Sequence, residues 1–142
     1  MPTINPYLAF NGDCENAFSF YKSVFGGEFM YTGRFKDMPP EFKVPEEDKE
    51  KIMHIALPIG EHTFLMGSDT SSSMGGPVKT GTNFSISVNT KSEEEADRIF
   101  DGLSEGGQVD MPMQKMFWGA YFGSLRDKFG IAWMMSYEYG EE

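Results

Sequence analysis

Two stretches of the chain place apolar residues at the spacing of an amphipathic helix. In residues 14–25 these positions recur at i, i+3, i+4, i+7, i+10 and i+11, and residues 96–103 repeat the start of this spacing. Asp13 stands at the expected N-cap of the first stretch, while Ser92 and Glu95 have the spacing of a capping box before the second. A glycine pair follows each stretch, which predicts where both helices end.

The two predicted helices mark equivalent points of an internal repeat, because Gly26 and Gly106 lie 80 residues apart. Strand patterns occupy residues 4–10, 28–35, 53–59 and 62–66 in the first copy, and 83–88, 108–113, 118–126 and 131–138 in the second. We therefore predict an α+β fold in which residues 1–142 form one domain. Two tandem βαβββ modules, about 1–67 and 80–138, build it and are joined by a Ser/Gly-rich linker.

Two irregular segments separate these elements. Residues 36–50 contain three prolines and interrupt the first module, whereas residues 68–82 are rich in serine and glycine and connect the modules. The segment inside the module is long enough to cover a pocket as a flap, but a floppy surface loop would have the same composition. Both interpretations stay open at this stage.

Side chains alternate between the two faces of a strand, which assigns each residue of the predicted hairpin 53–66 to one face. A two-residue turn at Gly60-Glu61 would place Ile59 opposite His62. In that register His54 and Leu65 share the face opposite the helix. The two histidines then lie on opposite faces, about 16 Å apart, so one metal ion cannot bind both.

The strand patterns of the second module sort in the same way. Alternation in residues 83–88 turns Phe84, Ile86 and Val88 toward the helix and leaves Asn83 and Ser85 on the other face. In the last strand Trp133 belongs to the bulky face, whereas Met134 belongs to the face with Asn83 and Ser85. The polar character of that face predicts an open, cup-like surface.

The excess of acidic side chains argues against some classes of binding partner. The chain carries 12 basic and 22 acidic side chains, a net charge of −10, which repels nucleic acid and anionic membranes. It has no apolar run long enough to cross a bilayer and no secretory signal at its start, so we expect a soluble, cytoplasmic protein. The single cysteine, Cys14, fits a reducing compartment, and we expect its thiol to pack in the core.

Short motifs along nearly the whole chain resemble one known family. They are Pro6–Gly12 (PYLAFNG), Ala17, Phe20-Tyr21, Phe25-Gly26, Met53-His54, Ser68-Asp69, Phe117-Trp118-Gly119, Gly123, and Arg126-Asp127 with Phe129-Gly130. The chain thereby resembles the PhnB-like branch of the vicinal oxygen chelate superfamily, which includes glyoxalase, bleomycin-resistance protein and extradiol dioxygenase. The usual Asp-Pro-Phe-Gly turn of that branch reads Asp127-Lys128-Phe129-Gly130 here.

The resemblance implies a cup-shaped mixed sheet, a homodimer and a small-molecule site in the cup. The metal-binding positions of its metal-dependent relatives correspond here to Pro6, Leu65, Asn83 and Met134. Proline and leucine cannot bind a metal, and asparagine and methionine are poor anchors, so we expect no metal at these positions. Relatives are also described as methyltransferases, but no glycine-rich strand-to-helix turn is present, and we expect no cofactor.

The aromatic stretch FWGAYFGSLRDKFG, residues 117–130, has two possible registers. A type I turn followed by left-handed Gly130 makes a bulge and places Trp118 and Phe122 on the cup face with Met134. Without the bulge, Phe117, Tyr121 and Leu125 line the cup instead. Turn chemistry favours the bulge, although aromatic residues that only fill the core would give the same composition.

These observations lead to a main hypothesis and two alternatives. The main one is a metal-free protein that binds an unknown amphipathic small molecule through His54, Leu65, Asn83, Ser85, Trp118, Phe122 and Met134. The first alternative is an enzyme of the glyoxalase or dioxygenase type. It would use an unrecognised metal site, or His54 as acid or base with Asp69 as its partner. The second is an interaction module that functions through its dimer surface.

Overall fold

The computed structural model describes residues 2–72 and 75–140, and it contains both helices and all eight strands that the hydrophobic pattern predicts. The chain forms two compact units, Met1–Lys79 (unit 1) and Thr80–Glu142 (unit 2). The connecting segment thus belongs mainly to unit 1, and its residues 73 and 74 lie outside the described part. No helix among the described residues has the length and apolar character needed to span a bilayer.

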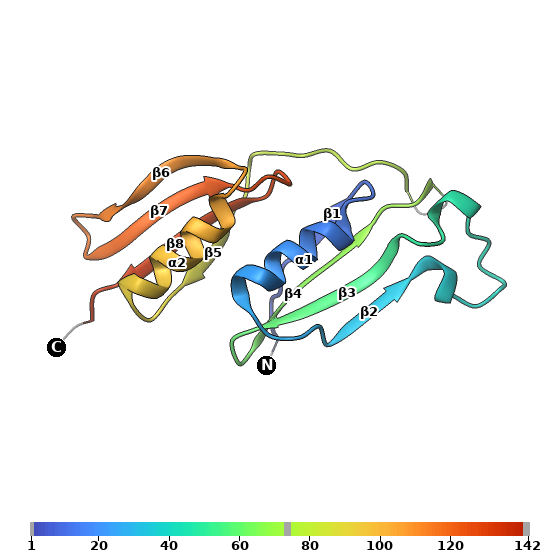
Figure 1. Ribbon diagram of the computed structural model, residues 1–142, viewed down its shortest axis with the longest axis horizontal. Coiled ribbons are helices and arrows are strands. Elements are labelled where there is room, and N and C mark those ends of the chain that lie inside the picture. Colours follow the sequence, from blue (N-terminus) through green and yellow to red (C-terminus); the bar gives the residue numbers. More distant parts are fainter. Residues whose placement is uncertain (1, 73–74, 141–142) are drawn as a thin grey trace. The chain divides into compact units, whose positions relative to one another are not determined.

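Unit 1 is a four-stranded mixed sheet with one long helix (Figure 1). Its strands lie in the order β1-β4-β3-β2, with β1 parallel to β4 and the other neighbours antiparallel. The elements are β1 (Tyr7–Phe10), α1 (Cys14–Phe25), β2 (Tyr31–Arg34), the short 3-10 helices η1 (Phe35–Asp37) and η2 (Glu46–Asp48), β3 (Ile52–Ile59) and β4 (Thr63–Asp69).

Unit 2 repeats this topology. Its strands lie in the order β5-β8-β7-β6, and β5 runs parallel to β8. The elements are β5 (Ile86–Asn89), α2 (Glu93–Ser104), β6 (Gln108–Lys115), β7 (Ala120–Arg126) and β8 (Ala132–Glu138). The matching strand orders confirm the predicted duplication of a βαβββ module.

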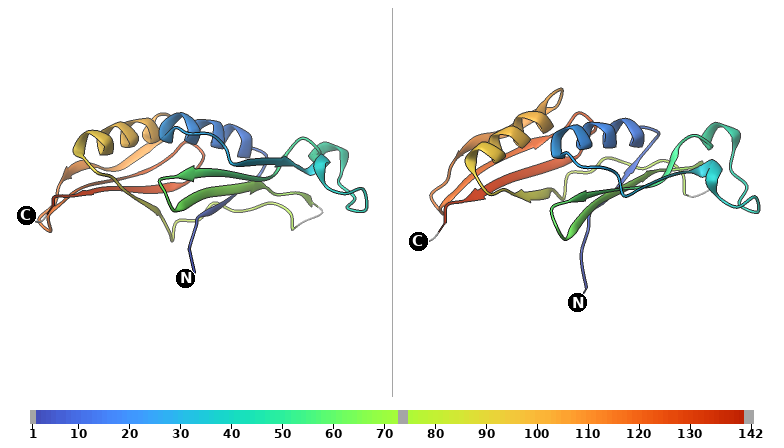
Figure 2. Two further views of the ribbon diagram at one scale, coloured as in Figure 1. Left: turned by 90° about the horizontal axis from the view of Figure 1, so that it is seen from below. Right: turned by 60° about the horizontal axis from the view of Figure 1, so that its bottom comes forward.

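Each helix lies on one face of its own sheet (Figure 2), and its buried apolar stripe packs there. The buried stripe is Cys14, Ala17, Phe18, Tyr21 and Val24 in α1, and Ala96, Ile99, Phe100 and Leu103 in α2. Burial of a large apolar side chain contributes about 1.5–3 kcal/mol, so these stripes hold the helices on the sheets. Cys14 belongs to the core as predicted, and burial raises the pKa of its thiol.

Two strand glycines allow the helices to approach the sheets closely. A methyl group at Gly67 would lie 2.7 Å from the ring of Phe18 and 2.8 Å from the carbonyl oxygen of Leu8. A methyl group at Gly123 would lie 2.9 Å from the ring of Phe100. These contacts identify the strand faces covered by α1 and α2, because side chains alternate along a strand.

The two helices begin in different ways. Ser92 caps α2 as predicted, since its Oγ accepts the N–H of Glu95 at 3.0 Å. Asp13 occupies the N-cap position of α1, but its side chain makes no capping hydrogen bond, so this part of the prediction is wrong. The buried Asp69 at the end of β4 acts instead. Its Oδ1 accepts the N–H groups of Gly12 and Cys14, both at 2.9 Å.

Asp69 also holds the start of β3, because its Oδ2 accepts the N–H of Ile52 at 3.0 Å. Asp69→Asn replaces one of these acceptor oxygens by a donor group and removes the charge. It is expected to lower the free energy of unfolding by about 3 kcal/mol, measured by urea denaturation followed by circular dichroism. Asp13→Asn is the matched control and should change it by no more than about 0.5 kcal/mol. Unchanged stability of the Asp69 variant would contradict this role.

Candidate functional site

Unit 1 carries a cluster of rings on the sheet face that α1 does not cover, called open face 1 here. The Tyr7 hydroxyl lies 3.1 Å from Nδ1 of His54, and the two rings stack with centroids 5.6 Å apart. The Tyr31 ring lies 5.7 Å from the His54 ring. Gly33, the strand partner of His54, leaves room for Tyr31, since a methyl group there would lie 2.6 Å from its hydroxyl oxygen. His54 thus lies on the face that its alternation predicts.

The tyrosines of open face 1 are about half exposed, at 50% for Tyr7 and 47% for Tyr31. Sequence reasoning did not select them, although each lies on a strand predicted next to the site. A cavity of about 290 Å³ adjoins this face and is lined by Tyr7, Ala9, Phe35, Met53, Ser68, Asp69 and Thr70. Open face 1 therefore offers rings, an imidazole and a hydroxyl beside a small cavity.

Asp69 lines this cavity, but none of its described hydrogen bonds is with His54. Its two carboxylate oxygens accept the three backbone N–H groups described above, and the described hydrogen bond of His54 is with Tyr7. The predicted pairing of His54 with Asp69 is therefore absent from the described contacts. Asp69 instead positions the strands around the imidazole.

Leu65 lies on the opposite face from the one predicted. The hairpin between β3 and β4 has a three-residue turn, so Ile59 pairs with Thr63 and not with His62. This shift of one residue turns Leu65 to the side of Gly67, under α1, where it is 2% exposed. Leu65 is a core residue, and its assignment to the cup is wrong.

Unit 2 has a corresponding uncovered face, called open face 2. Asp127 accepts the N–H of Gly130 at 2.9 Å and donates its own to Ile131 at 2.8 Å, which is the predicted bulged turn. The register aligns Ser124 with Met134 and Phe122 with Ser136, all on the face opposite α2. The alternative register is excluded, because Leu125 is buried and the Tyr121 hydroxyl donates to Asp97 of α2 at 2.7 Å.

Trp118 stands at the end of open face 2, in the turn before β7. Its ring lies 6.1 Å from the ring of Phe122 and 5.1 Å from that of Phe117. Trp118 is 58% exposed, so it is not a core residue. The structure thus brings together Trp118 and Phe122 on the face that also carries Met134.

The remaining predicted polar contacts lie beside the sheet and not within it. Asn83 and Ser85 are exposed and precede β5, which begins at Ile86, three residues later than predicted. Ser87, which pairs with Met134, is the polar residue that this strand places on open face 2. A single cup that contains His54 together with the unit 2 residues stays a prediction.

The residues at the family's metal positions do not fit a metal ion. Pro6 has no donor side chain, and Leu65 faces the core, which leaves Asn83 and Met134 as the only side chains with donor atoms. Among the described residues, no group of three or more His, Cys, Asp or Glu side chains could hold a metal ion. We therefore assign no step to a metal at these positions.

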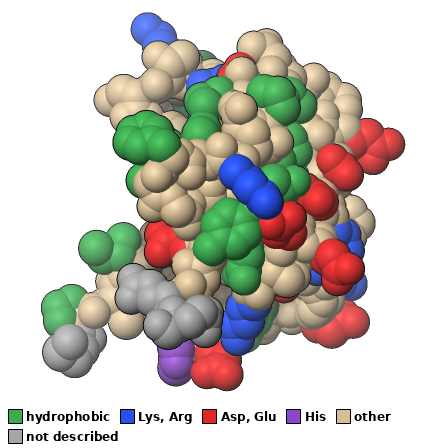
Figure 3. Space-filling view, turned by 90° about the vertical axis from the view of Figure 1, so that its left-hand side faces the viewer, with side chains coloured by type: hydrophobic (Ala, Val, Ile, Leu, Met, Phe, Trp, Pro, Cys, Tyr) green, Lys and Arg blue, Asp and Glu red, His purple; other side chains and the backbone are tan. Residues whose placement is uncertain are grey.

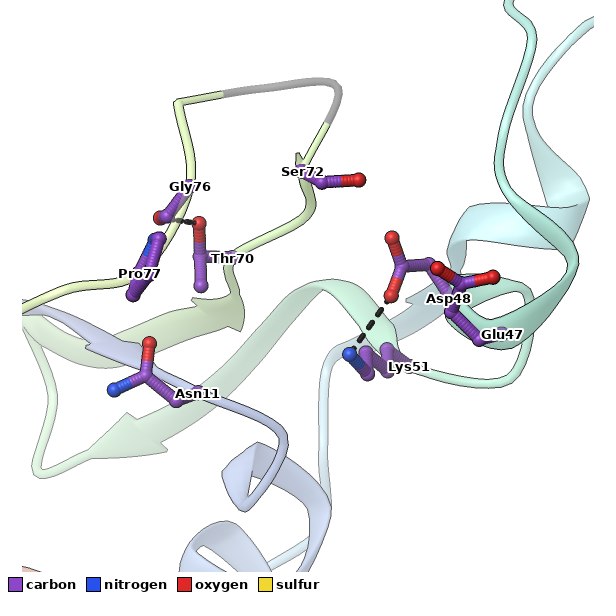
Figure 4. A pocket seen from close by; sticks show the side chains of 8 residues that line it. All are labelled: Asn11, Glu47, Asp48, Lys51, Thr70, Ser72, Gly76 and Pro77. Carbon is purple, nitrogen blue, oxygen red and sulfur yellow. Dashed lines mark hydrogen bonds and ion pairs between the residues drawn. The ribbon is translucent and has the colours of Figure 1, made fainter.

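A second pocket lies between the two irregular segments of unit 1 and is shown in Figure 4. It has a volume of about 280 Å³ and is lined by Asn11, Glu47, Asp48, Lys51, Thr70, Ser72, Gly76 and Pro77. The buried Asp48 accepts hydrogen bonds from Lys51 at 2.7 Å and Ser71 at 2.8 Å, and the first of these lowers the pKa of its carboxyl. The polar groups here hydrogen-bond to one another, and the bond between Asp48 and Ser71 connects the two irregular segments. We therefore assign this pocket a structural role.

The surface charge is uneven. Figure 3 shows acidic side chains gathered along one margin of the face that it displays, with hydrophobic side chains exposed elsewhere on it. Acidic residues also form the first turn of α2, where the helix dipole favours negative charge, namely Glu93, Glu94 and Glu95. The net charge of −10 favours cationic over anionic partners.

Comparison with known proteins places the chain in a family. The family model described as 3-demethylubiquinone-9 3-methyltransferase matches residues 2–136. Protein YjdN of Escherichia coli (strain K12) is 31% identical over 137 residues, which span 94% of this chain and 93% of that protein. The crystal structure of protein PA1353 from Pseudomonas aeruginosa is 42% identical with a TM-score of 0.85, covering 97% of this chain and 98% of that chain.

More distant solved structures share the fold. A putative 3-demethylubiquinone-9 3-methyltransferase, PhnB protein, from Bacillus cereus is 25% identical with a TM-score of 0.72, over 96% of this chain and 99% of that one. A glyoxalase-related enzyme from Fulvimarina pelagi is 18% identical with a TM-score of 0.62, over 97% and 89% of the two chains. The chain therefore belongs to the PhnB-like family described as 3-demethylubiquinone-9 3-methyltransferase and has the fold of the glyoxalase, bleomycin-resistance and dioxygenase superfamily.

Proposed function

We propose that this chain binds a small amphipathic molecule, without a metal ion, through the side chains of open faces 1 and 2. The supporting observation is the exposure of Tyr7, Tyr31 and Trp118, between 47% and 58%, on or beside sheet faces that the helices do not cover. Aromatic side chains contribute most of their binding energy when their rings are buried. Rings that stay half exposed beside a histidine and a cavity are typical of a ligand-binding surface.

The proposed contacts fall into apolar and polar groups. Trp118, Phe122 and Met134 supply apolar surface in unit 2. His54, which hydrogen-bonds Tyr7, supplies a polar contact in unit 1. The exposed Asn83 and Ser85 supply further polar contacts from the segment before β5. Leu65 has no part in this set, because it belongs to the core.

The negative net charge of the chain affects which ligands it can bind. A net charge of −10 favours a cationic or neutral ligand at the open faces and disfavours nucleic acid. A homodimer and a cytoplasmic location complete the proposal. The homodimer rests on the family resemblance, and the location rests on a chain with a single, buried cysteine.

The family description names a methyltransferase, but the architecture of this chain supports binding better than methyl transfer. Doubly wound nucleotide-binding folds place the cofactor at a glycine-rich turn between a parallel strand and a helix. Each unit here is a four-stranded sheet with mixed strand directions. We therefore propose ligand binding, and not methyl transfer, as the function.

The aromatic contacts can be tested with rhodamine 6G, a fluorescent amphipathic cation. Trp118→Ala is expected to weaken its binding about tenfold in a fluorescence anisotropy titration, because stacking and burial against the indole are lost. Phe42→Ala is the matched control, since Phe42 is 54% exposed but lies outside both open faces, and it should leave the affinity unchanged. Equal affinities of the wild type and the Trp118 variant would contradict the proposed contact.

Metal independence gives a separate prediction. Tag-free protein purified without chelators should contain far less than one equivalent of zinc, nickel, iron or manganese by elemental analysis. Dialysis against EDTA should also leave rhodamine 6G binding unchanged, because the proposed contacts are side chains of the protein alone. A stoichiometric metal ion would overturn the metal-free part of the proposal and point to a lyase or dioxygenase.

One observation favours an enzyme as the second candidate function. The hydrogen bond between the Tyr7 hydroxyl and Nδ1 of His54 orients the imidazole ring, and Nε2 has no partner among the described contacts. A histidine held at one nitrogen and open at the other is suited to transfer a proton to or from a ligand. Such an enzyme would act on the same ligand surface.

This alternative makes a specific prediction for any reaction that the wild-type protein catalyses. His54→Ala should lower kcat/KM at least about 100-fold, because general acid–base catalysis contributes at least that much. His62→Ala is the matched control, because His62 lies exposed in the turn between β3 and β4. Full activity of the His54 variant would rule out this form of catalysis.

A further inference from the structure

Residues 35–50, which make up all but the last residue of the segment between β2 and β3, form a loop that is closed at its base. The N–H of Phe35 donates to the carbonyl of Lys51 at 3.1 Å, and the N–H of Lys36 donates to that of Lys49 at 3.0 Å. The Arg34 guanidinium donates to the carbonyl of Glu50 at 2.6 Å and forms a two-pronged pair with Glu15 of α1. This segment, called loop 35–50, therefore has a defined framework, in contrast to a floppy surface loop.

Residues of loop 35–50 line an open cavity. The cavity has a volume of about 400 Å³, which lies in the usual range for small-molecule pockets. Its apolar lining consists of Phe35, Met38, Pro40, Phe42 and Val44. Phe35 is buried, whereas Phe42 is 54% exposed. A cavity with one buried and one exposed ring suits a ligand with an apolar body.

The polar lining of this cavity has the opposite charge to the rest of the chain. Lys36, Lys43 and Lys49 line it, and its described lining contains no Asp or Glu. Lys36 pairs with Glu50 at 3.0 Å and Lys49 with Glu46 at 3.2 Å. All four of these side chains are 45% or more exposed, so the pairs contribute little to stability and can be exchanged for a ligand.

Lys43 is the ammonium group in this cavity without a described ion pair. A protein with 22 acidic and 12 basic side chains has ample carboxylates to neutralise its lysines. Loop 35–50 carries six acidic and three basic side chains, but its lysines are the only charged side chains in the described lining of the cavity. An anion at the cavity mouth would interact favourably with these ammonium groups, and the effect would fall with salt.

We propose that loop 35–50 binds a small amphipathic anion, with its apolar body against Phe35, Phe42 and Val44 and its carboxylate on Lys43, Lys36 and Lys49. This site is independent of the proposed function, since it requires neither open face. It also selects the opposite charge of ligand. The loop thus gives an acidic protein a place to bind an organic acid.

Decanoate, which joins a ten-carbon body to a carboxylate, is the probe for this site. Calorimetric titration at low ionic strength should show saturable binding of decanoate and at least about tenfold weaker binding of decyltrimethylammonium. Lys43→Gln should weaken decanoate binding about threefold, and the triple variant K36Q/K43Q/K49Q about tenfold or more. Lys91→Gln, an exposed lysine of unit 2, is the control and should have no effect.

Three further measurements decide the outcome. Phe42→Ser should weaken decanoate binding but not rhodamine 6G binding, and Trp118→Ala should do the reverse, which separates this site from the open faces. Binding should also weaken as salt rises. The proposal is overturned if the triple variant binds decanoate as tightly as the wild type does. It is equally overturned if the protein binds phosphatidylglycerol vesicles but not free decanoate, since the lysines would then form a membrane-binding surface.

Discussion

The buried carboxylate of Asp69 is the interaction on which the geometry of unit 1 depends. Its two oxygens accept hydrogen bonds from the connection between β1 and α1 and from the first residue of β3. A buried carboxylate is costly unless it is fully hydrogen-bonded, and here three backbone N–H groups satisfy it. Because Asp69 ends β4, it sets the mutual position of three strands and one helix. The place of His54 and the base of loop 35–50 both follow from this position.

Unit 2 uses a buried aspartate for a different purpose. Asp127 accepts the N–H groups of Phe129 and Ile131 and the indole N–H of Trp133, at 2.8 to 3.0 Å. These bonds stabilise the bulged turn between β7 and β8 and anchor the large core residue of β8. Because the bulge sets the register, it also decides that Phe122 faces away from α2. The identity of the rings on open face 2 thus depends on one turn.

Local sequence signals predicted most of the fold, and the failures have physical reasons. Periodicity identified both long helices and all eight strands but not the 3-10 helices η1 and η2, and the turn residues Asp127–Gly130 were sufficient to select the register of the hairpin. Gly60 was compatible with turns of two or three residues, and a shift of one residue reverses every side chain of a strand. This is why Leu65 was misplaced. The hydrogen bonds of Asp69 to the backbone could not be predicted from local sequence, because its partners lie 17 to 57 positions away.

A comparison of the two duplicated units identifies the segment that is present in only one of them. Both units have the same strand order, yet their connections between the second and third strands differ greatly. Residues 116–119 join β6 to β7 by a tight turn, whereas residues 35–51 separate β2 from β3. A long connection without a counterpart in the sister unit is not needed for the fold, and long loops in compact domains are mostly functional. The shared sheets thus supply the open faces, while loop 35–50, with its lysines and its cavity, is the feature that distinguishes unit 1 from its copy.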